Sequence, residues 1–268
     1  MKISEDNLVC VVLPVYKHDL NEFEVVSLKQ CFEILSHYPI ALICSYNLNV
    51  QEYQKIANSV RKELQVIRKD PDYFSGIEGY NKLLLSEQFY SHFSSFKYIL
   101  IYQTDCYVFR DELKIWCNKG YDYIGAPWIN IDLYKWLLLK DLYPAKLRIV
   151  HSFFKNRFIS KVGNGGFSLR NVSKFISILK KHETAAKNWK AYEDSFFSHY
   201  IGTFDPFFKI AKVDTALKFS FDIFPELAFK LNNMKLPFGC HAWNRDDVPP
   251  YTGNFKFWKT IIFSHETI

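Results

Sequence analysis

Several features are absent from this 268-residue sequence. No uninterrupted apolar stretch is long enough to cross a bilayer, and the apolar run at 8–15 is too brief for a signal peptide followed by its cleavage site. There is also no internal repeat, low-complexity tract or linker, so we expect one domain with elaborations. These absences predict a cytoplasmic protein.

Paired cysteine spacings are absent too. None of the six cysteines forms the CxxC pattern of zinc sites and redox motifs, and most lie within apolar segments. We therefore interpret them as small buried hydrophobes in a reducing compartment. They are Cys10, Cys31, Cys44, Cys106, Cys117 and Cys240.

Nucleotide-binding signatures are missing as well. The glycine-rich segment 163–166 is not followed by Gly-Lys-Ser/Thr, so it is no Walker loop, and it does not match GxGxxG. The formal charge of +6 is modest, and Lys and Arg do not concentrate into a recognised motif, which argues weakly for anionic ligands or surfaces and against nucleic acid as a partner. The composition, 49% hydrophobic and 18% aromatic, is that of an ordered globular protein with a substantial core.

What is present is a succession of buried strands and amphipathic helices. Apolar runs without alternation are typical of strands covered on both faces, and helical spacing separates them. The pattern predicts an α/β fold built from βαβ units. We expect strands at 8–15, 40–44, 64–68, 98–102, 121–128, 216–222 and 236–243, and helices at 21–36, 50–63, 111–119 and 171–181.

The run 98–102 ends abruptly on Gln103, Thr104 and Asp105. Ligands gather at the carboxyl ends of strands in open α/β sheets, so this triplet marks a candidate site. The alternative is a turn or helix cap. A polar turn containing Tyr16 and Lys17 follows Pro14 at the end of the first strand, and a ligand loop is possible there.

Each of the other candidate residues could have either a functional role or an ordinary structural role. Asn81 lies near a helix start that favours anions, or on a solvated face. Trp128 is either a platform for a sugar ring or core. Gly165 and Gly166 line a ligand pocket or a tight hairpin. The aromatic and basic segment 129–161 is an insertion suited to an anionic membrane surface or an acceptor, or a helical excursion packed on the sheet.

Three later residues could carry chemistry. Glu193 and Asp194 stand at a predicted helix start, where acids are commonly caps, although the helix dipole would also keep Asp194 ionised and ready to accept a proton. His241 lies between small residues near Trp243, and it is either a satisfied core histidine or a metal ligand.

Taken in order, the segments 103–105, 121–128, 163–170, 193–194 and 237–243 resemble a bacterial glycosyltransferase-like family, defined by an uncharacterised domain and often found in polysaccharide loci. The resemblance spans nearly the whole chain. It implies a GT-A-like, Rossmann-like fold with a mixed, mostly parallel central sheet flanked by helices. It also implies one domain, 1–268, in which 1–128 bind the nucleotide-sugar, 129–161 form an insertion and 162–268 form the acceptor and catalytic half.

The resemblance also implies roles. Residues 103–105 occupy the place of an Asp-x-Asp motif, but a glutamine replaces the first acid, so Asp105 and the late His241 are left as ligands of Mn²⁺ or Mg²⁺. Asp194, with Glu193 beside it, falls where inverting members place the general base. The implied donor-binding residues are Pro14, Tyr16, Lys17, Asn81, Gln103, Thr104 and Asp105, and the implied acceptor-binding residues are Trp128, Gly165 and Gly166.

The resulting hypothesis is a glycosyltransferase that moves a hexose-type sugar from a nucleotide-diphosphate-sugar to a glycan or lipid-linked glycan in bacterial surface polysaccharide synthesis, such as that of O-antigen or capsule. It would act in the cytoplasm, peripherally on the inner face of the cytoplasmic membrane. The alternatives are a retaining transferase and a non-catalytic carbohydrate-binding or assembly protein with a decayed site.

Overall fold

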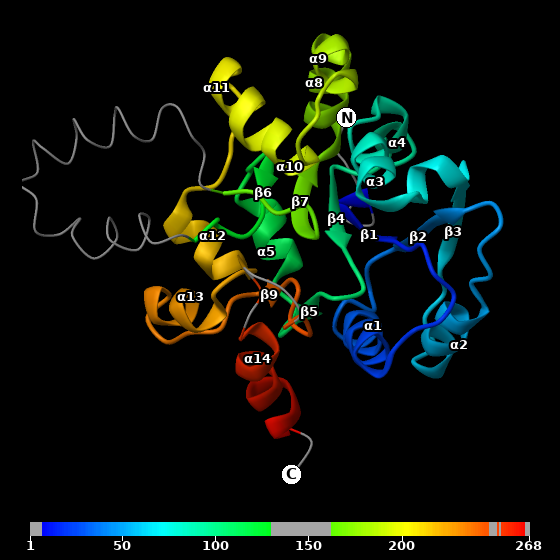
Figure 1. The fold of residues 1–268 in the computed structure, drawn as a ribbon, viewed down its shortest axis with the longest axis vertical. Helices are drawn as coiled ribbons and strands as arrows, with labels where there is room; N and C mark the ends of the chain where they lie inside the picture. The colour runs from blue at the N-terminus through cyan, green and yellow to red at the C-terminus, as the bar shows by residue number, and fades with distance from the viewer. Residues whose placement is uncertain (1–6, 130–161, 247–250, 252, 266–268) are drawn as a thin grey trace, which may run out of the picture.

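The strands and helices alternate along most of a computed structural model, which describes residues 7–129, 162–246, 251 and 253–265 (Figure 1). The strands are β1 (Val9–Pro14), β2 (Ile40–Ser45), β3 (Gln65–Lys69), β4 (Tyr98–Tyr102), β5 (Tyr107–Val108), β6 (Tyr123–Ile124), β7 (Phe167–Asn171), β8 (Ser220–Phe221) and β9 (Gly239–Cys240). The helices of the first half are α1 (Glu22–Ile34), α2 (Gln51–Ser59), α3 (Gly76–Leu84), α4 (Glu87–Ser91) and α5 (Leu113–Asn118).

Shorter helices dominate the second half. They are α8 (Val172–Lys181), α9 (Glu183–Lys187), α10 (Glu193–Ser195), α11 (Gly202–Phe204), α12 (Val213–Phe219), α13 (Pro225–Leu231) and α14 (Asn254–Ile262). A π-helix (Phe196–Ile201) joins α10 to α11, and 3-10 turns lie at Pro71–Phe74 and Phe263–His265.

Six strands form the main sheet in the order β3-β2-β1-β4-β7-β6. The first four are parallel, whereas β7 runs antiparallel to both β4 and β6. The chain turns from β1 toward β2 on one side and returns to pair β4 on the other, so the carboxyl ends of β1 and β4 form a topological switch point. A ligand crevice is expected there.

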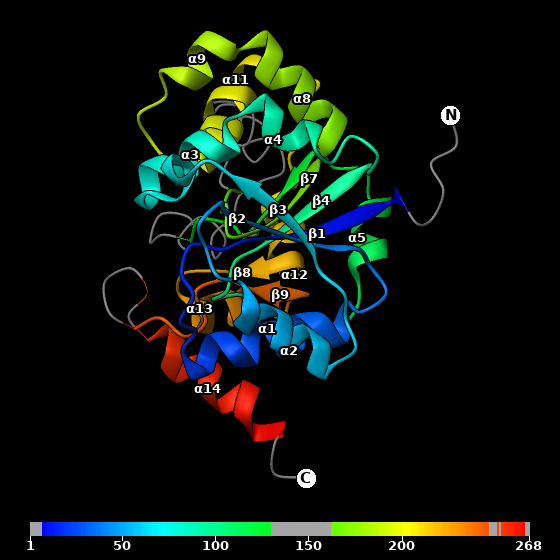
Figure 2. The same ribbon diagram turned by 90° about the vertical axis from the view of Figure 1, so that its right-hand side faces the viewer.

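Helices cover both faces of this sheet (Figure 2). Alternate residues of β1 point to opposite faces: Val11 and Leu13 join a core with α1 and α2, whereas Cys10 and Val12 join a core with α3, α4 and α8. The α/β fold predicted from the unbroken apolar runs is confirmed.

A smaller sheet of order β5-β9-β8 lies beside the main one and supports the C-terminal part of the site. Its β9 pairs antiparallel with β5 and parallel with β8. Trp243 and Trp258 pack with it in a third core that includes α13 and α14. This arrangement brings the ends of β8 and β9 toward the residues that follow β4.

Three expected strands differ from the structure. The one expected at 121–128 reduces to Tyr123–Ile124. The prediction of a strand at 216–222 is wrong, because a helix continues to Phe219 and only Ser220–Phe221 is extended. Leu217, Phe219 and Phe221 alternate along the sequence as apolar residues do in a strand. Ala216 and Leu217 are neighbours, however, and both are buried, which fits a helix packed on the core. The expected strand at 236–243 reduces to Gly239–Cys240.

The aromatic and basic insertion predicted at 129–161 lies, apart from its first residue, outside the described residues. Its division from the flanking halves therefore stays a prediction. Among the helices in the described part of the chain, none combines the length and apolar character needed to span a membrane.

Candidate active site

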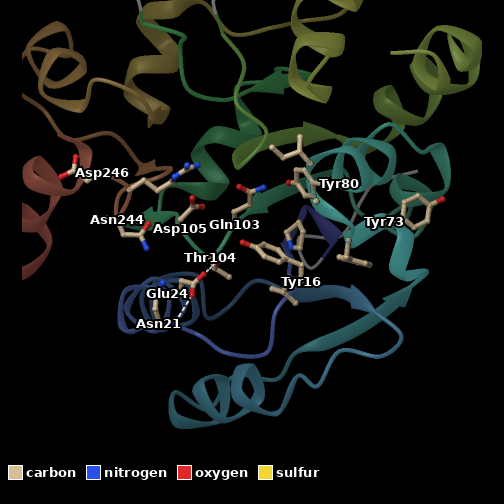
Figure 3. A pocket seen from close by; sticks show the side chains of 16 residues that line it. Tyr16, Asn21, Glu24, Tyr73, Tyr80, Gln103, Thr104, Asp105, Asn244 and Asp246 are labelled. Atoms are coloured by element: carbon tan, nitrogen blue, oxygen red, sulfur yellow. Dashed lines mark hydrogen bonds between the residues drawn. The ribbon is translucent and has the colours of Figure 1, made fainter. Parts of the chain in front are cut away.

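A cavity of about 710 Å³ opens at the carboxyl ends of β1 and β4 (Figure 3). Pro14 and Tyr16 contribute one wall, and Gln103, Thr104 and Asp105 contribute another. The family resemblance implied that residues at both strand ends bind the donor, and the structure brings these strand ends together. Helix α1, the 3-10 turn, α3 and the loop after β9 complete the lining with Asn21, Glu24, Tyr73, Phe74, Ile77, Tyr80, Asn244, Arg245 and Asp246.

Asp105 lines the cavity and is adjacent to His241, which is buried behind the lining. Asp105 Oδ1 lies 3.3 Å from His241 Nε2, and the side chain of Asp105 is 23% exposed. Gln103 Oε1 lies 2.9 Å from the same nitrogen. Burial opposes the charged form of Asp105, but His241 lowers the pKa of that carboxyl below its ordinary value. Arg245 adds a positive charge that acts in the same direction.

A second carboxylate holds the other side of the imidazole. Asp222 Oδ1 lies 3.0 Å from His241 Nδ1 and is buried. Burial disfavours the charged imidazole, but Asp105 and Asp222 outweigh it and raise the pKa of His241 to about 10. His241 is thus fixed between two acids, with Nε2 directed at Asp105.

The residues present fit a divalent metal ion. A histidine whose far nitrogen is held by a carboxylate is the usual arrangement of a metal-ligating imidazole, and Asp222 provides that carboxylate. Asp105, Cys106 and His241 have potential ligand atoms within 4.8 Å of one another. The Cys106 thiol, however, donates to Gly166 O at 3.2 Å, and burial raises its pKa well above the ordinary value. Asp105 and His241 are therefore the ligands that the structure favours, with Gln103 Oε1 close by.

Asn164 connects this cluster to Asp194. Its backbone N–H donates to Asp194 Oδ2 at 3.2 Å, while its side-chain nitrogen lies 3.0 Å from His241 Nδ1. The side-chain oxygen accepts from the N–H groups of Gly166 and Phe167, which fixes the orientation of the amide. Asn164 has a φ of 81°, in the left-handed region. Its backbone is therefore strained at the position that links Asp194 to His241.

Glu193 has a different environment from its neighbour Asp194. Its two carboxylate oxygens lie 2.9 and 3.0 Å from the Arg170 guanidinium, and both side chains are buried. Tyr90 Oη accepts a further hydrogen bond from Arg170, and the N–H of Glu193 donates to Asn81 Oδ1. Burial raises the pKa of Glu193, and the guanidinium opposes that rise. The Glu193 carboxylate is therefore engaged in an ion pair with Arg170.

Asp194 accepts only backbone N–H groups in the described part of the chain, from Asn164 and Ser195. Burial raises the pKa of this carboxyl above its ordinary value. The two backbone N–H groups oppose that rise, and the expectation that the helix start keeps Asp194 ionised stays a prediction. A raised pKa makes Asp194 a stronger base than an exposed aspartate.

The glycines at 163–166 are explained by close approach of site side chains. A Cβ at Gly165 would collide with Glu193 Oε1, and a Cβ at Gly166 would collide with His241 Nε2. A Cβ at Gly163 would collide with the ring of Trp128, which also contacts His199 at 4.9 Å between ring centroids. These positions pack directly against the site; their predicted contact with an acceptor stays a prediction.

Two predicted donor-binding residues lie away from the cavity lining. Lys17 Nζ forms a 2.7 Å ion pair with Glu24, whose carboxylate also accepts from Thr104. Asn81 accepts from Glu193 N–H instead of facing the cavity. Lys17 touches a residue of the lining, while Asn81 supports the Arg170 ion pair.

The sequence interpretation missed the contact of Asp222 with His241, the role of Arg170 and the supporting role of Asn164. Asp222 carried a usable signal, because it follows an apolar run just as Asp105 does. The pairing of Arg170 with Glu193 joins residues 23 positions apart through the fold, and no local pattern indicates it.

Solved structures with the same fold are glycosyltransferases. The structure titled galactosyltransferase LgtC, in complex with donor and acceptor sugar analogs, has a TM-score of 0.52 at 12% identity, over 97% of both chains. The bifunctional glycosyltransferase WbbM has a TM-score of 0.53 at 13% identity, over 98% of this chain and 52% of its own. The glycosyltransferase GlyE of Streptococcus pneumoniae TIGR4 has a TM-score of 0.50 at 14% identity, over 97% of this chain and 64% of its own.

These similarities show a GT-A glycosyltransferase fold, as the sequence resemblance predicted. The association with polysaccharide loci stays a prediction. No curated protein matches the chain. A family model described as "Protein of unknown function (DUF5672)" matches residues 63–241, and the chain therefore belongs to the DUF5672 family.

Proposed function

We propose that this protein is a glycosyltransferase that moves a hexose-type sugar from a nucleotide-diphosphate-sugar to a glycan acceptor, with inversion at the anomeric carbon. One observation carries the proposal: Asn164 contacts both Asp194 and His241, so it links the Asp194 carboxylate to the Asp105–His241 cluster, of which Asp105 lines the cavity at the switch point of the sheet. Transfer from such a donor needs both groups.

The cavity supports the donor assignment. Its volume of about 710 Å³ lies within the usual range of small-molecule sites, roughly 300–1,000 Å³. Tyr16 and Tyr73 supply aromatic surface for a base, and Asn21 supplies polar atoms. The diphosphate would extend toward Asp105 and Arg245.

Asp105 and His241 would hold Mn²⁺ or Mg²⁺. The bound ion would neutralise charge on the leaving diphosphate. Arg245 lines the same cavity and contributes a second positive charge there. Asp222 keeps His241 oriented, so its role is positioning.

Asp194 would act as the general base. The acceptor hydroxyl oxygen attacks the anomeric carbon, its proton passes to an Asp194 oxygen, and the bond from carbon to the diphosphate oxygen breaks. The nucleoside diphosphate leaves with the electron pair. Glu193 supports this arrangement structurally, because Arg170 occupies both of its oxygens.

The acceptor side would lie near Trp128 and the 163–166 segment, in which Gly166 packs against His241 and Gln103 and Gly163 packs against Trp128. By the sequence resemblance, the acceptor would be a glycan or lipid-linked glycan of a bacterial surface polysaccharide, such as O-antigen or capsule, extended at the cytoplasmic face of the membrane.

A panel of nucleotide-sugars tests the proposal. We expect one donor to release its nucleoside diphosphate slowly in the presence of Mn²⁺, detected by a coupled assay, and Asp105→Asn to abolish the release. The matched control is Asp214→Asn, an exposed acid outside the lining of the cavity. Glycan binding without turnover of any donor would instead support a carbohydrate-binding protein with a decayed site.

A further inference from the structure

The stretch from α9 to the turn after α11 presents large aromatic side chains to solvent. Phe207 is 80% exposed and Phe204 is 64% exposed, and Tyr192 is 62% exposed. Helices α9 and α11 lie at the same end of the molecule in both views (Figures 1 and 2). We call Tyr192, Tyr200, Phe204 and Phe207 the aromatic patch. Exposed aromatics gathered in this way often mark an interaction surface.

The turn that carries Phe207 is held by specific bonds. Asp205 accepts from the N–H of Phe207 at 2.9 Å, and its own N–H donates to Ile201 O. Lys174 lies 3.4 Å from the Asp205 carboxylate. Phe208 points inward and is buried, so the turn is anchored on the core while Phe207 projects outward. The exposure is built into the fold.

A row of rings connects the patch to the core. Phe196 is buried and stacks on Tyr200 with centroids 5.3 Å apart and planes 18° from parallel. Tyr200 contacts Phe204 at 4.9 Å, and Trp189 contacts Tyr200 at 5.8 Å. Trp189 also donates from Nε1 to Tyr192 O, which connects Tyr192 to the same row. Tyr192, Tyr200 and Phe204 are thus connected with the buried Phe196.

The charge that faces solvent along this stretch is predominantly positive. Between 183 and 214 the exposed acids are Glu183 and Asp214, whereas Glu193, Asp194 and Asp205 are not exposed. All of the lysines in the same range are exposed. Lys187 pairs with Glu183. The others are Lys190, Lys209 and Lys212, beside Tyr192 and Phe207 in sequence.

We propose that the aromatic patch docks on an anionic lipid bilayer. Tyrosine and tryptophan rings favour the headgroup level, phenylalanines insert more deeply, and lysines attract anionic headgroups. Charge complementarity selects this occupant over a neutral apolar partner. The patch and Asp194 belong to one continuous stretch of chain, so a membrane-anchored substrate would approach from this side. The inference stands without the transferase proposal, because membrane binding requires no turnover.

Vesicle flotation of the full chain tests the docking surface. We expect wild-type protein to float with phosphatidylcholine vesicles that contain phosphatidylglycerol, and to bind pure phosphatidylcholine vesicles much more weakly. Phe204→Ser combined with Phe207→Ser should reduce partitioning at least about tenfold. Lys190→Gln, Lys209→Gln and Lys212→Gln together should remove the preference for phosphatidylglycerol.

The matched control replaces exposed apolar side chains elsewhere, Tyr46→Ser with Ile115→Ser, and should float like wild type. A melting temperature within a few degrees of wild type checks that each variant is folded. Absence of wild-type flotation overturns the proposal, and so does unchanged flotation of the phenylalanine variant. Conversion of a wild-type dimer into a monomer by that variant, seen by sedimentation without a change in flotation, also overturns it in favour of a subunit interface.

Discussion

Two adjacent carboxylates belong to opposite kinds of environment. Glu193 is buried against Arg170 and serves an ion pair inside the protein, whereas Asp194 accepts only backbone N–H groups among the described residues and borders the Asp105–His241 cluster. At this helix start, Glu193 contributes to stability, whereas the proposed function assigns catalysis to the adjacent Asp194. The ion pair fixes the backbone at 193, and the proposed function assigns the next residue to the substrate.

The largest expected effect is the loss of turnover in Asp194→Asn. If Asp194 removes the acceptor proton, sugar transfer should fall roughly 100- to 10,000-fold while binding of the donor nucleotide is retained. Turnover numbers and nucleotide titrations of the folded variant measure the two properties separately. Glu226→Gln, which changes an exposed acid on α13, should transfer at the wild-type rate. Near-normal transfer by Asp194→Asn would contradict the assignment of Asp194 to catalysis.

Glu193→Ala should instead affect stability. It leaves the buried Arg170 guanidinium unpaired, which typically costs about 3–5 kcal/mol in the free energy of unfolding. Urea unfolding measures this loss. The double variant Arg170→Leu with Glu193→Leu should recover a large part of it, because no buried charge remains. A Glu193→Ala protein as stable as wild type would show that the pair contributes little.

The positioning role of Asp222 predicts a smaller effect. Asp222→Asn removes the charge that orients His241 but leaves Asp105 in place, so Mn²⁺ affinity should fall about 10- to 100-fold. Isothermal titration with Mn²⁺ and a nucleoside diphosphate measures the change. Asp105→Asn should weaken binding further. Equal affinity in wild type and Asp222→Asn would remove Asp222 from the metal site.

The smallest effect concerns pH and stability. Burial raises the folded-state pKa of Asp194 above its ordinary value of 3.8, so ionisation destabilises the folded state. The wild type therefore loses stability as pH rises through that folded pKa, and Asp194→Asn does not. We expect the variant to melt at a higher temperature than wild type at pH 7, with the difference shrinking as pH falls toward 4. A lower melting temperature at pH 7 would contradict the burial effect.

Local patterns predicted the parallel half of the fold well. The strand expected at 40–44 is Ile40–Ser45, and the helix expected at 21–36 is Glu22–Ile34, which begins at an Asn21 capping box. Unbroken apolar runs and caps are local signals, so they can be read without the fold. The second half depends more on tertiary packing, and the helix that ends at Phe219 was taken for a strand.

The site was predicted in part. Asp105 and His241 were expected together through the family resemblance, and the structure places them 3.3 Å apart. The direction in which the pKa of Asp194 shifts could not be predicted, because it depends on burial, which the local sequence does not show. The contacts of Arg170 could not be predicted either, because Tyr90 precedes it by 80 positions and Glu193 follows it by 23.

The anomeric configuration of the first product tests the central claim most directly. A single displacement with Asp194 as the base inverts the anomeric carbon of the donor sugar. Proton NMR of the product, recorded before any mutarotation, reports that configuration once a donor is known from the hydrolysis panel. We predict the configuration opposite to that of the donor, and a product of retained configuration would contradict the assignment of Asp194.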